Sequence, residues 1–518
     1  MNSIQLSVFA SRIEAVCDEM GVVLRRAAFS PNIKERLDYS CAIFDAAGEL
    51  CAQAAHIPVH LGSMAYAMRD IVSEIAWTEG DMIILNDPYL GGTHLPDVTL
   101  IAPVYVKQQL LGFVANRAHH ADIGANAPGS MPLSQHLDEE GLIIPPTRLV
   151  QHGELDEQVF TELMTGLHDG ARARGDFLAQ ISANQCGSAR LCQLIESLGQ
   201  KDFCDGLTAL NDYAERLASA SLADIPSGEY CFDDVMDDDG YGNHNIRIQC
   251  RLTVNNKGIE LDFAGSSPQV QGNINAPLSV AAASVYYVFR CLMPDQTPAC
   301  AGSFRNIRLK APKGSLLNAC YPAAVAAGNV ETSTRVVDVV MGALAQAIPE
   351  RIPAASHGSM NNLAMGSRDV VNSWDYYETM GGGMGAGAKN DGLSAIQTHM
   401  TNTLNTPIEA LELNYPLRVV QYAVRHGSGG QGLQRGGDGI IREFEFLKPA
   451  SFTLLTERRT TQPWGLKGGE HGRCGENLLN GHPLPAKVHR QAKVGDRLTV
   501  MSAGGGGWGL SPDKETDH

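Results

Sequence analysis

The residue types best suited to chemistry gather in a short segment near residue 95. His94 and Asp97 lie three residues apart, and Gly91, Gly92 and Pro96 keep this segment from forming a regular helix. Without helical geometry, both side chains can turn toward one point. An imidazole and a carboxylate on one loop form half of a ligand set for Zn²⁺, Mn²⁺ or Fe²⁺, which accept nitrogen and oxygen donors.

A second loop can supply the remaining donors. His119 and His120 follow two runs of β-branched and apolar residues, 98–106 and 110–116, which are separated by polar residues. This pattern predicts two strands of a hairpin. Because a hairpin returns the chain to its starting end, we expect the second loop to lie beside Asp97.

Two interpretations of these residues remain open on residue chemistry alone. A histidine beside an aspartate is ordinarily a hydrogen-bonded pair in a loop. Here the strand-loop-strand unit holds three histidines and three aspartates, which are His94, His119, His120, Asp87, Asp97 and Asp122. The convergence of so many donors favours a metal centre with an open position for water or substrate.

Length and composition restrict the class of protein. A chain of 518 residues should form two to four domains. The formal net charge of −17 argues against nucleic acid or an anionic membrane as a partner, because both require a basic surface. The twelve cysteines form no CxxC pair, so we expect reduced thiols in a cytoplasmic protein. No run of eighteen apolar residues occurs, so we expect the protein to be soluble.

Hydrophobic periodicity predicts the elements that position these loops. Apolar residues recur at spacings of three and four over 6–23, which predicts an amphipathic helix that ends before Pro31. The residues 39–45 are typical of a strand. A further helix is expected to carry Met64 and Met68 on one face, with Ser63 as its N-cap.

The remaining chain is expected to complete an α+β fold with mixed or antiparallel sheets. We expect helices over 156–222, a hairpin over 246–263 and a helix near 337–348. The acidic run 233–239 is interpreted as an exposed turn, and glycine-rich loops follow residue 375. The predicted division is a metal-site domain 1–150, a helical subdomain 151–225, a hairpin-and-helix domain 226–375 and a glycine-rich β domain 376–518.

No segment has the features of a nucleotide-binding loop. Three windows fit the pattern G-x-G-x-x-G/A, at 381–386, 427–432 and 504–509, but none continues into a convincing helix. A pyrophosphate would therefore lack the helix N-terminus that normally receives it. We predict that this chain does not bind ATP by itself.

The chain resembles the hydantoinase B/oxoprolinase family, whose relatives include subunits of acetone and acetophenone carboxylases. The resemblance spans nearly the whole sequence. It is carried by Asn-Asp-Pro-Tyr at 86–89, His-Leu-Pro-Asp at 94–97, His-His-Ala-Asp at 119–122, Asp-Phe-Ala-Gly-Ser-Ser-Pro-Gln at 262–269, Ala-Gly-Asn at 327–329, His-Met-Thr-Asn-Thr at 399–403, Glu-Ala-Leu-Glu at 409–412, Arg-Gly-Gly-Asp-Gly at 435–439, Pro-Trp-Gly-Leu at 463–466 and the glycines 504–507.

The resemblance implies which residues form the site. It implies a divalent metal held by His94, Asp97 and His119, with Asp38 as the additional carboxylate. His120 and Asp122 are expected beside these ligands, and we assign them catalytic roles.

The resemblance also implies a reaction divided between two polypeptides. A hydantoinase A-like ATPase partner would phosphorylate the carbonyl oxygen of a cyclic amide, such as a hydantoin, 5-oxoproline or a lactam. This chain would then open the ring with water activated by the metal. A ketone carboxylase of the same hetero-oligomeric type is the alternative, and a non-catalytic scaffold is a third interpretation.

Overall fold

The computed structural model describes residues 1–55, 57–369 and 373–511, which contain two compact units. Unit 1 comprises Met1–Gly124, Gly141–Asp224 and Phe289–Arg308, and unit 2 comprises Ala125–Glu140, Ile225–Val288 and Leu309–His518. Both combine helices with antiparallel sheets, which confirms the predicted α+β class. The division into four consecutive domains stays a prediction.

Unit 1 is built on a seven-stranded antiparallel sheet in the order β2-β1-β5-β4-β3-β6-β7. Its strands are β1 Tyr39–Asp45, β2 Leu50–Ala55, β3 Met82–Leu85, β4 Asp97–Val106, β5 Gln109–His119, β6 Thr147–Gln151 and β7 Glu154–Leu155. Its helices are α1 Ser3–Ala27, α2 Pro31–Lys34, α3 Pro58–Glu74, α4 Glu157–Thr165, α5 Gly170–Leu198 and α6 Gln200–Leu222. The predicted first helix, first strand and helical segment are confirmed.

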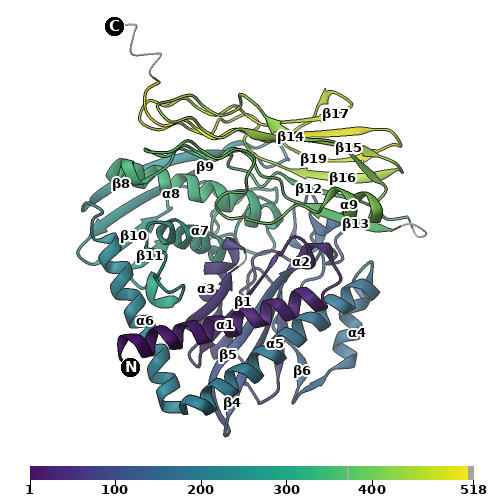
Figure 1. The fold of residues 1–518 in the computed structure, drawn as a ribbon. Helices are drawn as coiled ribbons and strands as arrows, with labels where there is room; N and C mark the ends of the chain where they lie inside the picture. Colours follow the sequence, from purple (N-terminus) through teal and green to yellow (C-terminus); the bar gives the residue numbers. More distant parts are fainter. Residues whose placement is uncertain (56, 370–372, 512–518) are drawn as a thin grey trace. The chain divides into compact units, whose positions relative to one another are not determined.

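Two helices pack against the central strands of this sheet. Met64, Met68 and Ile71 of α3 form an apolar core with β-strand residues that include Ile101 and Phe113. Helix α5 packs on β4 and β5 as well, and α1 lies beside α5 (Figure 1). The prediction of Ser63 as an N-cap is wrong, because Pro58, whose ring presets helical geometry, starts α3 one and a half turns earlier.

The remaining strands form three sheets, in the orders β11-β10-β9-β8, β13-β12-β16-β19 and β14-β15-β20-β17-β18, which lie largely in unit 2. The pairs β8–β9 and β9–β10 and all neighbouring pairs of the other two sheets are antiparallel. The strands are β8 Gly228–Asp238, β9 His244–Asn255, β10 Gly258–Asp262, β11 Ile307–Lys310, β12 Asn362–Ser367, β13 Trp374–Glu378, β14 Leu417–Arg425, β15 Gly439–Phe446, β16 Ala450–Leu455, β17 Glu476–Leu479, β18 His482–Pro483, β19 Lys487–Ala492 and β20 Arg497–Met501. The helices are α7 Leu278–Cys291, α8 Ser333–Ala347 and α9 Ile408–Asn414, and a π-helical turn, Gly328–Thr332, leads into α8. The predicted hairpin and the helix near 337–348 are confirmed.

The acidic run 233–239 does not form the exposed turn that was predicted. Residues 233–238 lie in β8 and Asp239 directly follows that strand, and Asp237 and Asp239 are only 2% and 0% exposed. Asp237 accepts hydrogen bonds from the backbone N–H groups of Thr460 and Thr461, and Asp234 pairs with Arg458 at 2.7 Å. The burial is tolerated because partners more than two hundred residues later compensate the charges, a pairing that local sequence patterns do not reveal.

Three glycine-rich segments of unit 2 pack backbone against backbone, and we call this arrangement the glycine stack. Its segments are 381–387, 427–439 and 504–509. The N–H of Gly505 donates to the carbonyl of Gly437 at 2.9 Å, and the N–H of Gly437 donates to that of Met384 at 2.8 Å. A Cβ added to Gly383 would lie 1.9 Å from the Gly437 oxygen, so the packing leaves no room for a side chain at this position.

Among the described helices, none combines the length and apolar character that crossing a membrane requires.

Candidate metal centre

The hairpin of β4 and β5 fixes two of the predicted ligands at one edge of the sheet of unit 1. Its turn is formed by Lys107 and Gln108, which both have positive φ, as a tight two-residue turn requires. Asp97 is the first residue of β4 and pairs directly with His119, the last residue of β5. Because directly paired residues carry their side chains side by side, the hairpin brings a carboxylate and an imidazole together.

Strand alternation determines which face of the sheet carries the site. Successive side chains of a strand point to opposite faces, so Arg117 and His119 share one face while Asn116 and His120 share the other. The contacts agree, because Arg117 donates to Ser63 of α3, whereas Asn116 donates to Asn184 of α5. The paired ligands therefore lie on the face that α3 covers.

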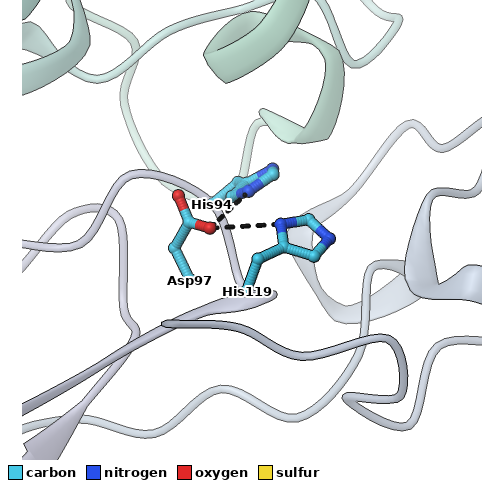
Figure 2. A group of neighbouring side chains, drawn as sticks. All are labelled: His94, Asp97 and His119. Atoms are coloured by element: carbon cyan, nitrogen blue, oxygen red, sulfur yellow. Dashed lines mark hydrogen bonds and ion pairs between the residues drawn. The ribbon is translucent and has the colours of Figure 1, made fainter. Parts of the chain in front are cut away.

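His94 completes a compact cluster with these two residues. Its Nε2 lies 3.1 Å from Asp97 Oδ1, and His119 Nδ1 lies 3.2 Å from the same oxygen (Figure 2). One ligand atom from each residue can be chosen so that all lie within 4.8 Å of one another, and all three residues are buried. The structure thus brings together His94, Asp97 and His119 as the sequence predicted.

The second oxygen of Asp97 is held by residues that the sequence analysis did not assign to the site. Thr93 donates its hydroxyl to Asp97 Oδ2 at 2.7 Å, and His60 Nε2 lies 3.4 Å from the same oxygen. Ser40 contacts the other ring nitrogen of His60 at 3.1 Å. His60 stands on α3, and only the packing of α3 on the sheet reveals its proximity to Asp97.

The electrostatics of the cluster favour an ionised Asp97. Burial alone would raise the pKa of this carboxyl, but His94, His60 and His119 outweigh burial and hold it well below its ordinary value. Burial lowers the pKa of the neighbouring Arg117 guanidinium to about 10, against the opposing effect of Asp97.

The donor set fits a divalent transition ion. Two imidazoles and one carboxylate, buried and close together, are the side chains that Zn²⁺, Mn²⁺ and Fe²⁺ accept, and fewer than four protein ligands leave a position for water or substrate. Among the described residues, this is the one group of three such side chains within that spacing.

Asp38 lies next to the cluster through its backbone. It immediately precedes β1, and its carbonyl accepts the N–H of His119 at 3.0 Å. Its carboxylate is not among the three grouped ligand atoms. Its assignment as an additional ligand stays a prediction.

His120 and Asp122 turn toward helix α5 and the residue before it. His120 stacks on Phe177, with ring centroids 4.4 Å apart, and its Nε2 lies 2.9 Å from Gln180 Oε1. Burial lowers the pKa of His120, although Asp176 and Gln180 act in the opposite direction. Asp122 accepts the N–H of Asp169 at 2.8 Å. The structure therefore does not group either side chain with the three candidate ligands.

A buried cluster of two histidines and an aspartate at the edge of an antiparallel α+β sheet defines a candidate metal-dependent enzyme. The family model described as hydantoinase B/oxoprolinase matches residues 2–511. The chain therefore belongs to the hydantoinase B/oxoprolinase family, which confirms the predicted resemblance.

Two relatives with named activities differ in how much of their length this chain covers. Over the whole length of this chain, the sequence is 37% identical to a 5-oxoprolinase of Dictyostelium discoideum, but the match covers only 41% of that protein. It is 32% identical to the B component of a putative D-/L-hydantoinase of a Pseudomonas species (strain NS671), again over its whole length, and covers 91% of that protein.

Two solved structures share the fold. An ATP-dependent caprolactamase from Pseudomonas jessenii is 29% identical, with a TM-score of 0.91 over 98% of this chain and 91% of the other. Acetone carboxylase in a nucleotide-free state is 19% identical, with a TM-score of 0.87 over 100% of this chain and 77% of the other. The second likeness supports the fold alone.

Proposed function

We propose that this chain is the metal-bearing subunit of a two-component, ATP-dependent amidohydrolase that opens a cyclic amide. The observation that carries the proposal is the buried cluster of His94, Asp97 and His119 at the open end of the hairpin. The names of the relatives, which are a 5-oxoprolinase, a hydantoinase component and a caprolactamase, support a cyclic amide as the substrate class.

The residues of the cluster would divide the work of holding a divalent ion. His94 and His119 would provide neutral imidazoles, and Asp97 would provide a negative oxygen while Thr93 and His60 orient its carboxylate. Asp38 would add a second carboxylate from the start of β1. A divalent ion held there would supply Lewis acidity and lower the pKa of water.

ATP would enter the reaction through a partner subunit of the hydantoinase A type. An amide resists water because resonance stabilises its carbonyl, and phosphorylation of the carbonyl oxygen makes the carbon electrophilic. Water can then add to that carbon, and the ring C–N bond can break as the nitrogen takes a proton to become the amine. Hydrolysis of the resulting acyl phosphate would release inorganic phosphate and leave the carboxylate of the ring-opened product. The hydantoinase relative is named as one subunit of its enzyme, which supports this division between two chains. In its isolated form this chain should not bind ATP, which calorimetry would measure.

His120 and Asp122 remain candidates for catalytic roles, as the sequence suggested. Their contacts with Gln180 and Asp169 favour a different role, in which they hold the loop after β5 in place. A carboxylase would need the same fold, but the likeness to acetone carboxylase carries no argument about this reaction.

The test is reconstitution of this chain with an ATPase partner, ATP and a panel of hydantoins, 5-oxoproline and lactams. We expect release of a ring-opened amino acid without added bicarbonate, and about one equivalent of divalent metal per chain. His94→Ala should lower both metal content and turnover at least about 100-fold, because a lost ligand weakens metal binding steeply. His152→Asn, in the exposed β6–β7 turn, is the matched control and should change neither.

Two results would overturn the proposal. One is ATP turnover that requires a ketone and bicarbonate and never opens a cyclic amide. The other is His94→Ala protein that retains wild-type turnover.

A further inference from the structure

We propose that Gln180 of helix α5 is a positioning residue for the metal centre and acts from the opposite face of the sheet. This inference rests on the proposed function of the cluster. Gln180 is fully buried, and its three side-chain hydrogen bonds reach none of His94, Asp97 and His119. It contacts instead the residues that follow two of these ligands.

The side-chain amide of Gln180 makes three hydrogen bonds, each to the ligand-bearing hairpin or the residue that follows it. Its Nε2 donates to the backbone carbonyl of Val98 at 2.9 Å and to Asn116 Oδ1 at 2.9 Å. Its Oε1 lies 2.9 Å from Nε2 of His120. Val98 follows Asp97 and His120 follows His119, so one amide joins the two strand ends from which the ligands project.

The orientation of this amide is fixed by its partners. The backbone carbonyl of Val98 can only accept, so the nitrogen of Gln180 must face it and the oxygen must face His120. His120 therefore carries a proton on Nε2 and donates it to Gln180. Both N–H groups and the oxygen of the Gln180 amide are then hydrogen-bonded. Only this orientation of the amide makes all three hydrogen bonds.

Gln180 belongs to a row of buried polar residues on α5 at spacings of four, which places them on one face of the helix. Asp176 accepts the N–H groups of Phe29 and Ser30 at 2.7 and 3.1 Å. Asn184 donates to the carbonyl of Leu100 at 3.1 Å and accepts from Asn116 at 2.8 Å.

Simple helix-on-sheet packing does not explain this row. A buried polar group adds little net stability even when it is hydrogen-bonded, and an apolar side chain would cover the same strands at no risk of an unpaired group. What polar side chains add is a fixed position of the strands along and across the helix. Gln180 fixes the ends of β4 and β5, and these strand ends carry Asp97 and His119. The ligand atoms of these two residues must be placed to within a few tenths of an ångström to bind a metal.

Substitution of Gln180 by methionine tests the inference, because methionine keeps the length of the side chain and removes all three hydrogen bonds. In metal-free protein, hydrogen exchange measured by mass spectrometry should be faster in peptides that contain 97–100 and 116–120. The affinity for Zn²⁺, measured by calorimetric titration, should fall about 10- to 100-fold, as is usual for residues that orient metal ligands.

Asn211→Leu is the matched control. Asn211 is a buried amide on α6 of the same unit, and its side chain accepts the N–H of Gly302 at 2.7 Å, away from the hairpin. Asn211→Leu should lower the free energy of unfolding about as much as the methionine substitution of Gln180 does. It should leave the Zn²⁺ affinity and the hydrogen exchange of 97–100 and 116–120 unchanged. Equal effects of the two substitutions on these readouts would overturn the inference, because Gln180 would then be only a structural residue.

A second variant covers the case in which the methionine protein does not fold. Gln180→Glu keeps the oxygen that faces His120 and removes both donors, so exchange should rise at 97–100 more than at 118–120. Wild-type exchange in both segments would refute the positioning role. If wild-type protein binds Zn²⁺ but opens no cyclic amide, the proposed function fails while these results on Gln180 still stand.

Discussion

Glu331 should make the stability of this protein fall as the pH rises toward neutrality, and Glu331→Gln should remove that fall. Glu331 lies in the π-helical turn before α8 and is fully buried. Its Oε1 accepts the N–H of Met360 at 2.9 Å and the side-chain amide of Asn362 at 2.7 Å. Burial, reinforced by the charge of Glu457, raises the pKa of Glu331 from 4.5 to about 7, although Ser359 and Lys487 oppose the shift.

The magnitude follows from the linkage between protonation and folding. At a pH between 4.5 and about 7, the folded protein keeps a proton on Glu331 that the unfolded chain has released. The contribution of protonated Glu331 to the free energy of unfolding is therefore complete below about pH 4.5 and is lost as the pH rises through 7. The rise in the pKa of Glu331 from 4.5 to about 7 corresponds to about 3 kcal/mol of stability at the limit. Between pH 5 and pH 8 the free energy of unfolding should therefore fall by about 2 to 3 kcal/mol through this group alone.

Equilibrium urea unfolding at several pH values, followed by tryptophan fluorescence, measures this difference. Glutamine offers an oxygen to the same two donors but carries no charge, so the variant should be more stable than wild type at pH 8 and should show a shallower pH dependence. Glu350→Gln, an exposed glutamate in the same unit, is the control and should follow wild type. If Glu331→Gln and wild type lose the same free energy between pH 5 and pH 8, the buried carboxyl is ionised in the folded protein and the reasoning is refuted.

Two further substitutions test the packing of unit 2, and thermal unfolding measures both. Gly383→Ala places a Cβ 1.9 Å from the Gly437 oxygen and should lower the free energy of unfolding by about 1 to 3 kcal/mol or more. The added Cβ of Gly387→Ala meets nothing within 4 Å, so this control should stay within about 0.5 kcal/mol of wild type. Equal melting temperatures for the two variants would contradict the packing described for the glycine stack. Arg442→Met leaves Glu378, whose Oε1 lies 3.1 Å from Arg442 Nε with both side chains fully buried, as an unpaired buried charge and should cost about 3 to 5 kcal/mol. Adding Glu378→Gln should recover part of that loss, and a double variant as unstable as the sum of the single ones would speak against the pair.

The sequence revealed the three clustered residues because their placement depends on local geometry. Two runs of β-branched and apolar residues predicted the hairpin, and a hairpin returns the chain to the end at which Asp97 lies. The register shift between Val104 and Tyr105, which no sequence pattern predicted, then pairs Asp97 with His119. The positions of His60 and Gln180 depend on how α3 and α5 pack against the two faces of the sheet. No periodicity in the sequence specifies which residue of a helix will meet which strand.

The two wrong predictions have related causes. The acidic residues of β8 looked solvent-exposed because some of their compensating cations lie far away in the sequence, such as Arg458, which is more than two hundred residues from Asp234. Ser63 fitted the N-cap preference, but the proline at position 58 had already started the helix, and the Ser63 hydroxyl donates to the carbonyl of Val59 instead. In both cases the local preference was real and a competing interaction outweighed it.

The glycine stack gives part of unit 2 an unusual response to temperature. Unfolding an apolar core, such as that of Phe444, Phe452 and Leu498, hydrates hydrocarbon and raises the heat capacity. Unfolding the stack hydrates peptide groups, and hydration of polar surface lowers the heat capacity. The stack should therefore lessen the curvature of the free energy of unfolding with temperature. Its contribution should also weaken less on cooling than that of the neighbouring apolar core, because hydrophobic stabilisation fades in the cold while backbone hydrogen bonds do not depend on it.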